Sequence, residues 1–216
     1  MRVPAGQQGH LRYPLTRLLG SSGNVRVLRA LADGLASSVT QIATAAGLTP
    51  QGTRLVLRAL TEQGIVTVKG SARTQLFELA AVHPFRPPIV ALFQAERSIW
   101  EDLVARLRER LQRRPGVRAA WLYGSVARGE DTPASDIDVA LLVSSTSVAD
   151  KVREDIMPIE DESKVRISIT ALTQQELAAI QDGDPWWSDV VRDARVLKGG
   201  RPESEMRNVL THLAGA

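Results

Sequence analysis

Hydrophobic residues in the first 80 positions recur every three or four residues in three stretches and then continue as two short runs rich in strand-forming side chains. The first spacing predicts amphipathic helices, and the second predicts strands. The predicted elements are helices over residues 24–35, 38–46 and 49–63 and strands over residues 65–68 and 74–79. Gly47 separates the second and third helices, and a polar segment, residues 69–73, separates the strands. This order predicts three helices followed by a hairpin with a basic tip.

The third of these helices has one apolar side and one polar side. Its apolar positions, which we expect to be buried, are Leu55, Val56, Leu57 and Leu60. Its polar positions, which we expect on the surface, are Gln51, Thr53, Arg54 and Arg58. The hairpin adds two cationic side chains near its tip, Lys69 and Arg73. At the start of the first helix, Asn24 occupies the position of a capping residue.

A proline-rich segment, residues 83–88, interrupts the helical pattern with three prolines in five residues and predicts a boundary. An amphipathic helix then begins near Ile89 and ends at Pro115 and Gly116. We expect its apolar stripe to pack against the domain that follows, and dimerisation through this helix, giving a homodimer, is the alternative. The expected parts of the chain are therefore residues 1–82, residues 83–115 as a connector, and residues 116–216.

Two acidic side chains stand at the start of a predicted strand in the last part of the chain. Strand patterns cover residues 117–123, 136–143 and 164–170, and a helix follows the third strand. Successive side chains of a strand point to opposite faces, so Asp136 and Asp138 point the same way. Two carboxylates on one face repel each other unless a hard cation lies between them. This pattern predicts a Mg²⁺ site.

The composition is that of an ordinary globular protein, with 44% hydrophobic and 24% charged residues among 216. The sequence contains no cysteine, which excludes a disulfide framework, a thiolate zinc site and a thiol nucleophile. No apolar run approaches the ~18 residues of a membrane span, and the first residues lack the pattern of a signal peptide. We therefore expect a soluble, cytoplasmic protein that does not associate with a membrane.

The charge of the chain is unevenly distributed. Residues 1–80 contain nine Lys and Arg against three Asp and Glu, whereas residues 81–216 contain 18 against 21. A basic part beside an acidic part predicts a module that binds a polyanion, joined to one that uses carboxylates.

The three helices and hairpin of the basic part resemble the winged helix-turn-helix domains of bacterial regulators. That resemblance implies DNA as a partner, with the third helix against base edges and the hairpin against phosphates. The residues that it implies for DNA binding are Gln51, Thr53, Arg54, Arg58, Lys69 and Arg73. Because many winged helices instead mediate protein–protein contacts, a dimerisation module is the alternative interpretation.

A glycine-serine pair precedes the two aspartates. Residues 124–130 read Gly-Ser-Val-Ala-Arg-Gly-Glu, and residues 135–138 read Ser-Asp-Ile-Asp. Gly124 leaves room for backbone N–H groups to approach a phosphate, and Ser125 adds a hydroxyl donor. This block closely resembles the signature of the polymerase-beta-like nucleotidyltransferase superfamily, and especially its small bacterial branch, the minimal nucleotidyltransferases.

The second resemblance implies a mixed sheet with helices, a bound nucleoside triphosphate (NTP), and in-line attack on its α-phosphate. Gly124 and Ser125 would hold the triphosphate, and Arg128 would contact a phosphate. Asp136 and Asp138 would be the catalytic residues and would bind Mg²⁺. An ion pair between Arg128 and a nearby acid, Glu130 or Asp131, is the alternative role of that arginine. The whole chain is thus expected to be α+β, with an N-terminal winged helix-turn-helix and a C-terminal nucleotidyltransferase domain.

The strand predicted over residues 164–170 departs from the family pattern. Active members carry a third acid on this strand, but the outward positions here are Arg166, Ser168 and Thr170. The acids of residues 160–162 precede the strand, and such a cluster is typical of a solvated loop. Two functions therefore remain: a Mg²⁺-dependent nucleotidyltransferase with a hydroxyl acceptor, or a DNA-binding regulator whose degenerate transferase domain binds nucleotide or mediates dimerisation. Two adjacent tryptophans, at 186 and 187, either stack on a base or pack in the core.

Overall fold

The computed structural model describes residues 18–71, 74–132 and 134–214. It divides into two compact units, Met1–Ile99 (unit 1) and Trp100–Ala216 (unit 2), with the division inside the long helix α5, Arg86–Arg113. Within the described ranges, every helix is too short or too polar to cross a membrane.

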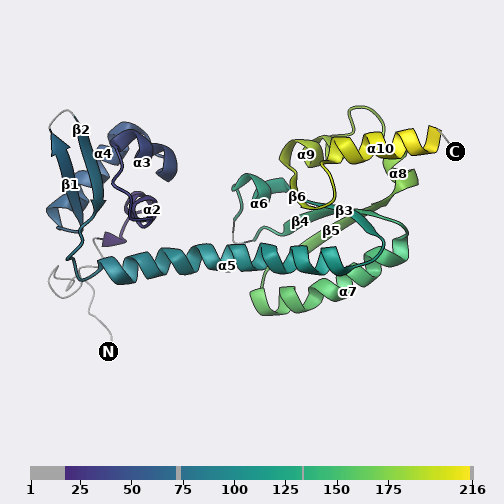
Figure 1. Ribbon diagram of the computed structural model, residues 1–216, viewed down its shortest axis with the longest axis horizontal. Helices are drawn as coiled ribbons and strands as arrows, with labels where there is room; N and C mark the ends of the chain where they lie inside the picture. Colours follow the sequence, from purple (N-terminus) through teal and green to yellow (C-terminus); the bar gives the residue numbers. More distant parts are fainter. Residues whose placement is uncertain (1–17, 72–73, 133, 215–216) are drawn as a thin grey trace. The chain divides into compact units, whose positions relative to one another are not determined.

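Unit 1 contains three short helices and a hairpin, as the sequence predicts (Figure 1). Its elements before α5 are α2 (Ser22–Leu31), α3 (Val39–Ala46), α4 (Pro50–Glu62), β1 (Val66–Ser71) and β2 (Thr74–Leu79). Each helix begins at a hydroxyl side chain that accepts a backbone N–H: Ser21 for α2, Ser38 for α3 and Thr49 for α4. The prediction that Asn24 caps the first helix was therefore wrong, because Asn24 instead donates its N–H to Ser21 Oγ.

The core of unit 1 lies between the three helices and the hairpin. Leu28, Leu31, Leu57 and Leu60 are all at most 1% exposed. Leu55 was predicted to be buried but is 59% exposed, because α4 turns residues 53, 57 and 60 toward the core.

The two strands of unit 1 form an antiparallel hairpin in which Val66 pairs with Leu79 and Ser71 with Thr74. The first strand extends beyond its predicted end at residue 68, so Lys69 lies within β1 instead of at the tip. Lys69 Nζ is 2.8 Å from Glu78 Oε1 on the neighbouring strand. Arg73, the other predicted tip cation, lies outside the described residues.

Unit 2 contains a four-stranded mixed sheet with the order β5-β4-β3-β6. Its strands are β3 (Val117–Tyr123), β4 (Ile137–Val143), β5 (Ile167–Thr173) and β6 (Arg195–Lys198). Strand β3 is antiparallel to both β4 and β6, whereas β4 and β5 are parallel. The helices after α5 are α6 (Gly124–Arg128), α7 (Thr146–Ser163), α8 (Gln174–Ala178), α9 (Pro185–Asp193) and α10 (Pro202–Ala214). The protein thus has the predicted α+β fold.

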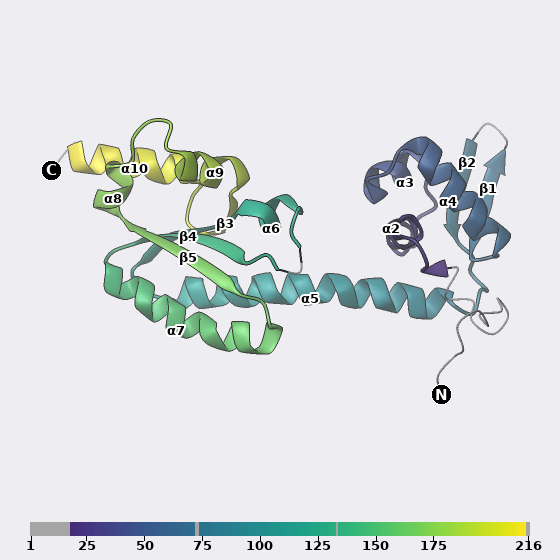
Figure 2. The same ribbon diagram turned by 180° about the vertical axis from the view of Figure 1, so that it is seen from behind.

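Helices cover both faces of this sheet (Figures 1 and 2). The part of α5 within unit 2 packs with α7 on one face, where Leu107, Leu122 and Val139 share a buried cluster. Helices α8, α9 and α10 cover the other face, where Trp121 and Val190 lie in a second cluster. The alternation of side chains along the buried strands supplies both clusters.

Two element boundaries differ from the prediction. Helix α5 begins at Arg86 instead of near Ile89, because Pro87 and Pro88 fall in its first turn, where proline is tolerated. Strand β5 begins at Ile167 instead of residue 164, because α7 continues to Ser163. The acids at 160–162, predicted as a solvated loop, therefore belong to the last turn of α7.

Candidate functional site

The two aspartates of the Asp-Ile-Asp motif lie where β4 begins. Asp136 directly precedes the strand, and Asp138 is its second residue. Asp138 is in register with Tyr123 on β3 and with Ser168 on β5. Ile137, between the aspartates, is 2% exposed and belongs to the cluster beneath the opposite face. The strand alternation therefore directs both carboxylates to one face, as the sequence predicts.

The backbone of Gly124 lies against the Asp138 carboxylate. Gly124 follows β3 and begins α6 with a φ of +77°, which side chains other than glycine rarely allow. A Cβ atom at this position would lie 2.5 Å from Asp138 Oδ2. Glycine is therefore favoured here both by the backbone conformation and by its close contact with the carboxylate.

The environment of Asp138 disfavours an isolated negative charge. Burial raises the pKa of this carboxyl above its ordinary value, and repulsion from Asp136 raises it further. In the part of the chain that the structure describes, no side chain donates a hydrogen bond to Asp138. A bound cation would remove this electrostatic cost, so the pair is suited to hold one.

The neighbouring strand presents no carboxylate to this pair. Ser168 lies beside Asp138 in the parallel register, and Arg166 Nε is 3.8 Å from Asp136 Oδ1. Glu160 accepts the backbone N–H of Ile167 at 2.7 Å, and Glu162 forms an ion pair with an arginine of α5. Among the described residues, no three His, Cys, Asp or Glu side chains form a group that could hold a metal. The site thus has two carboxylates on one side and a serine and an arginine on the other.

Arg128 belongs to a network of ion pairs within unit 2. Its Nε is 2.7 Å from Glu130 Oε2, and its guanidinium also pairs with Asp193 at the end of α9. The Asp193 side chain is only 2% exposed and also binds Arg192. The ion pair with Glu130 was the alternative role predicted for Arg128. Asp193 was missed, because 65 residues separate it from Arg128 and only the folded chain brings them together.

The paired tryptophans pack against aromatic residues of β3. Trp186 donates its indole N–H to the Tyr123 hydroxyl at 3.0 Å. Trp187 contacts Trp121 edge to face, with ring centroids 5.9 Å apart. Both tryptophans therefore help to hold α9 on the sheet, which supports the packing interpretation.

In unit 1, three of the four residues predicted for the DNA-contacting helix are exposed on α4: Gln51, Arg54 and Arg58. Thr53 is fully buried, and its hydroxyl donates to the carbonyl of Thr49 at 3.0 Å. The prediction that Thr53 lies on the surface of this helix is therefore wrong, because its side chain is buried and its hydroxyl already bonds inside the domain.

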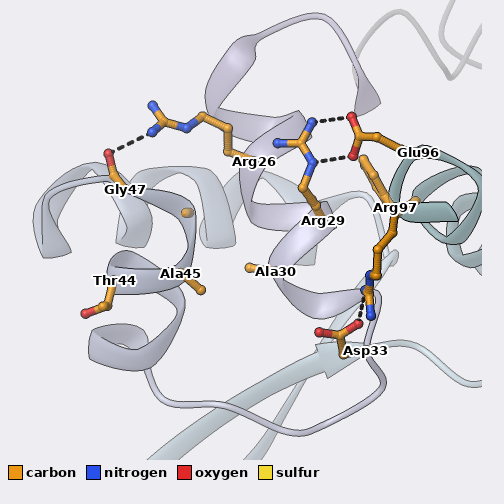
Figure 3. A pocket seen from close by; sticks show the side chains of 11 residues that line it. Arg26, Arg29, Ala30, Asp33, Thr44, Ala45, Gly47, Glu96 and Arg97 are labelled. Carbon is orange, nitrogen blue, oxygen red and sulfur yellow. Dashed lines mark hydrogen bonds and ion pairs between the residues drawn. The ribbon is translucent and has the colours of Figure 1, made fainter. Parts of the chain in front are cut away.

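A hollow of about 650 Å³ also lies in unit 1, between α2, the end of α3 and the first part of α5 (Figure 3). Arg29 forms two hydrogen bonds with Glu96, at 2.6 and 2.8 Å, and Arg97 pairs with Asp33. Arg26 donates to the carbonyl of Gly47 at 3.1 Å. The first two contacts hold α5 against α2 and the turn that follows it, and the third joins α2 to the C-terminal end of α3.

The geometry of unit 2 agrees with a family comparison. Residues 105–182 match the polymerase beta nucleotidyltransferase family. This segment contains the Gly124 turn, both aspartates and the neighbouring strand β5. Unit 2 is thus similar to this nucleotidyltransferase family over residues 105–182.

The chain also resembles several solved structures at low sequence identity. A toxin-antitoxin crystal structure with AMP-PNP is 16% identical over 52% of this chain and 87% of that chain, with a TM-score of 0.37. The AntR antimony-specific transcriptional repressor is 20% identical over 47% of this chain and 89% of that chain, with a TM-score of 0.36. The homodimeric winged helix-turn-helix DNA-binding domain Mb0332 from Mycobacterium bovis is 21% identical over 47% and 92%, with a TM-score of 0.32. No curated protein matches the sequence.

Proposed function

We propose that unit 2 is an enzyme that uses Mg²⁺ to transfer a nucleoside monophosphate from an NTP to a hydroxyl acceptor, with release of pyrophosphate, and that unit 1 binds DNA. The observation that carries the first part is the contact between the Gly124 backbone and Asp138, with Asp136 directed to the same face. This observation supports the proposal because the turn would bind phosphate next to two carboxylates that would hold a cation.

The donor set fits magnesium. Mg²⁺ prefers oxygen ligands and is commonly bound by one or two carboxylates together with substrate phosphates. Asp136 and Asp138 provide two carboxylates, and the raised pKa of Asp138 is the cost that a cation would offset. When bound, Mg²⁺ would neutralise charge on the phosphates during transfer.

The protein's own residues have separate tasks in this proposal. The absence of a side chain at Gly124 lets the turn approach the triphosphate, and Ser125 donates its hydroxyl to it. Asp136 and Asp138 would hold the cation beside the reacting phosphate. No carboxylate of β5 faces the acceptor, so the acceptor hydroxyl loses its proton to solvent or to a group that the acceptor brings. We therefore expect slow transfer compared with a site that has a general base.

The test is transfer of label from each α-labelled NTP, with Mg²⁺, to the protein itself and to lysate components. We expect label with wild type, loss of label with Asp138→Asn, and no change with the matched control Asp150→Asn, an exposed acid of α7. Absence of label with every NTP would overturn the transferase proposal.

The presence of Arg166 and Ser168 beside the aspartates favours a second candidate, a regulator that binds nucleotide without transferring it. This candidate requires that wild type binds an NTP and transfers no label, and that Asp138→Asn abolishes binding. The two functions are separated by measuring binding and transfer on the same preparation.

The DNA-binding part of the proposal rests on the exposed side chains of α4 and on the basic charge of the first 80 residues. Phosphate contacts make such binding strongly dependent on salt. The test is fluorescence anisotropy with the protein's own promoter DNA and with random duplex DNA at several salt concentrations. Equal, salt-independent signals on both duplexes would overturn DNA binding.

A further inference from the structure

We propose that Arg166 is a phosphate-binding residue that competes with the metal for Asp136: it pairs with Asp136 when the site holds no cation, and with the triphosphate when nucleotide binds. This inference rests on the proposed nucleotide site. The inference adds to that site a cationic residue, Arg166, which exchanges Asp136 for a phosphate when nucleotide binds.

The backbone of Arg166 is fixed beside the aspartates, whereas its side chain is not. The carbonyl of Arg166 accepts the N–H of Ile137 at 2.8 Å, between Asp136 and Asp138 in the sequence. Arg166 lies two residues before Ser168, so strand alternation directs it to the face that carries both aspartates. Its side chain is 86% exposed and can therefore change direction without leaving a cavity.

The contact between Arg166 and Asp136 is weak. A separation of 3.8 Å between Nε and Oδ1 is beyond hydrogen-bond range, and it is the one ion pair of Arg166 among the described residues. A guanidinium carries five N–H donors in a planar fork that matches phosphate oxygens. Most of this donor capacity remains for a ligand.

Arg128, the arginine that the sequence motif indicates, has fewer donors left for a ligand. It already binds Glu130 and the buried Asp193, so releasing it would leave a buried carboxylate with one cation fewer. Compared with Arg128, Arg166 can thus move to a phosphate at lower cost. A magnesium-bound triphosphate keeps a net negative charge, which this additional cation would offset.

The competition predicts opposite effects on two ligands. With Arg166→Gln, the full-length protein should bind Mn²⁺ alone about two to five times more tightly, because one competing cation is gone. The same variant should bind Mg²⁺-tripolyphosphate about ten times more weakly, because a charged hydrogen-bond donor is lost. Arg166→Lys should keep the Mn²⁺ affinity of wild type and have an intermediate affinity for tripolyphosphate.

Mn²⁺ binding is measured by electron paramagnetic resonance, and tripolyphosphate binding by calorimetry in saturating Mg²⁺. Arg153→Gln, at a half-exposed arginine of α7, removes the same charge elsewhere in unit 2 and should change neither affinity. If both affinities fall with Arg166→Gln, or if tripolyphosphate affinity is unchanged, the competition is refuted. If Asp138→Asn leaves both affinities at wild-type values, the proposed nucleotide site itself is refuted.

Discussion

The contact between Gly124 and Asp138 can be tested with a pair of glycines at the two ends of α6. Gly124 has a φ of +77° and Gly129 has a φ of +74°, so alanine is conformationally disfavoured at both. A Cβ at Gly129 would meet nothing within 4 Å, whereas a Cβ at Gly124 would lie 2.5 Å from Asp138 Oδ2. Gly129→Ala is therefore the matched control for Gly124→Ala.

The expected loss of stability has two contributions, the backbone conformation and the crowding of the new Cβ. The left-handed conformation costs an L-residue about 1–2 kcal/mol, which both variants share. The additional crowding at Gly124 is relieved by turning the end of the Asp138 side chain, so we expect about 1 kcal/mol more for Gly124→Ala. With Asp138→Ala, the nearest remaining atom is Cβ at 3.5 Å, an ordinary contact, so the difference between the two glycine variants should vanish.

Urea unfolding followed by tryptophan fluorescence measures this difference, because all four tryptophans belong to unit 2. Using a probe in one unit avoids treating the whole chain as one cooperative transition. Gly124→Ala should also weaken Mn²⁺ binding, while Gly129→Ala should not, because only the first displaces the carboxylate. Equal destabilisation by the two variants, or a difference that persists with Asp138→Ala, would refute the reasoning.

Three further predictions concern the other residues of the two units. Arg54→Ala should weaken DNA binding and reduce the slope of log K against log salt by about one if Arg54 contacts a phosphate; an unchanged slope and affinity would exclude this contact. Asp193→Asn should destabilise unit 2 by about 1–3 kcal/mol at pH 7, because its two arginine partners lose a carboxylate. Hydrogen bonds from Arg192 and Arg128 lower the pKa of Asp193 in the folded protein below its ordinary value of 3.8. The stabilisation by Asp193 is therefore complete above pH 3.8, and it is lost as the pH falls through the lower pKa of the folded protein. Urea unfolding of wild type and Asp193→Asn between pH 7 and pH 3 checks this. A difference in free energy of unfolding that stays constant over this range would contradict it. Ser168→Asp should add a third carboxylate beside Asp138 and strengthen Mn²⁺ binding about tenfold, and unchanged Mn²⁺ resonance titrations would show that the register does not bring the two side chains to one site.

Local patterns were sufficient for most elements and for the central motif. The helical spacing in unit 1 predicted α2, α3 and α4, because an apolar stripe is a local feature of the sequence. The alternation around Ile137 predicted that Asp136 and Asp138 share a face, because strand geometry alone determines this. The absence of an acid at the outward positions of residues 164–170 was also visible before folding.

The predictions were wrong where burial or ion pairing depends on how one element packs against another. Thr53 and Leu55 differ by only two positions, and which of them is buried depends on how α4 is rotated against the core. In the hairpin, Lys69 is in register with Leu76 and forms a diagonal ion pair with Glu78. A prediction that put Lys69 near the tip could not show this pair.

The sequence by itself determined the chemical groups of this protein: the three-helix order, the glycine-serine turn, and two carboxylates that must point the same way. The tertiary structure alone decided which partners these groups meet. It set the Gly124 backbone against Asp138, brought Asp193 to Arg128 across 65 residues, and placed Arg166 near Asp136. The physical reason is that side-chain alternation and capping act within a few residues, whereas burial, ion pairing and pKa depend on contacts made only when distant segments pack together.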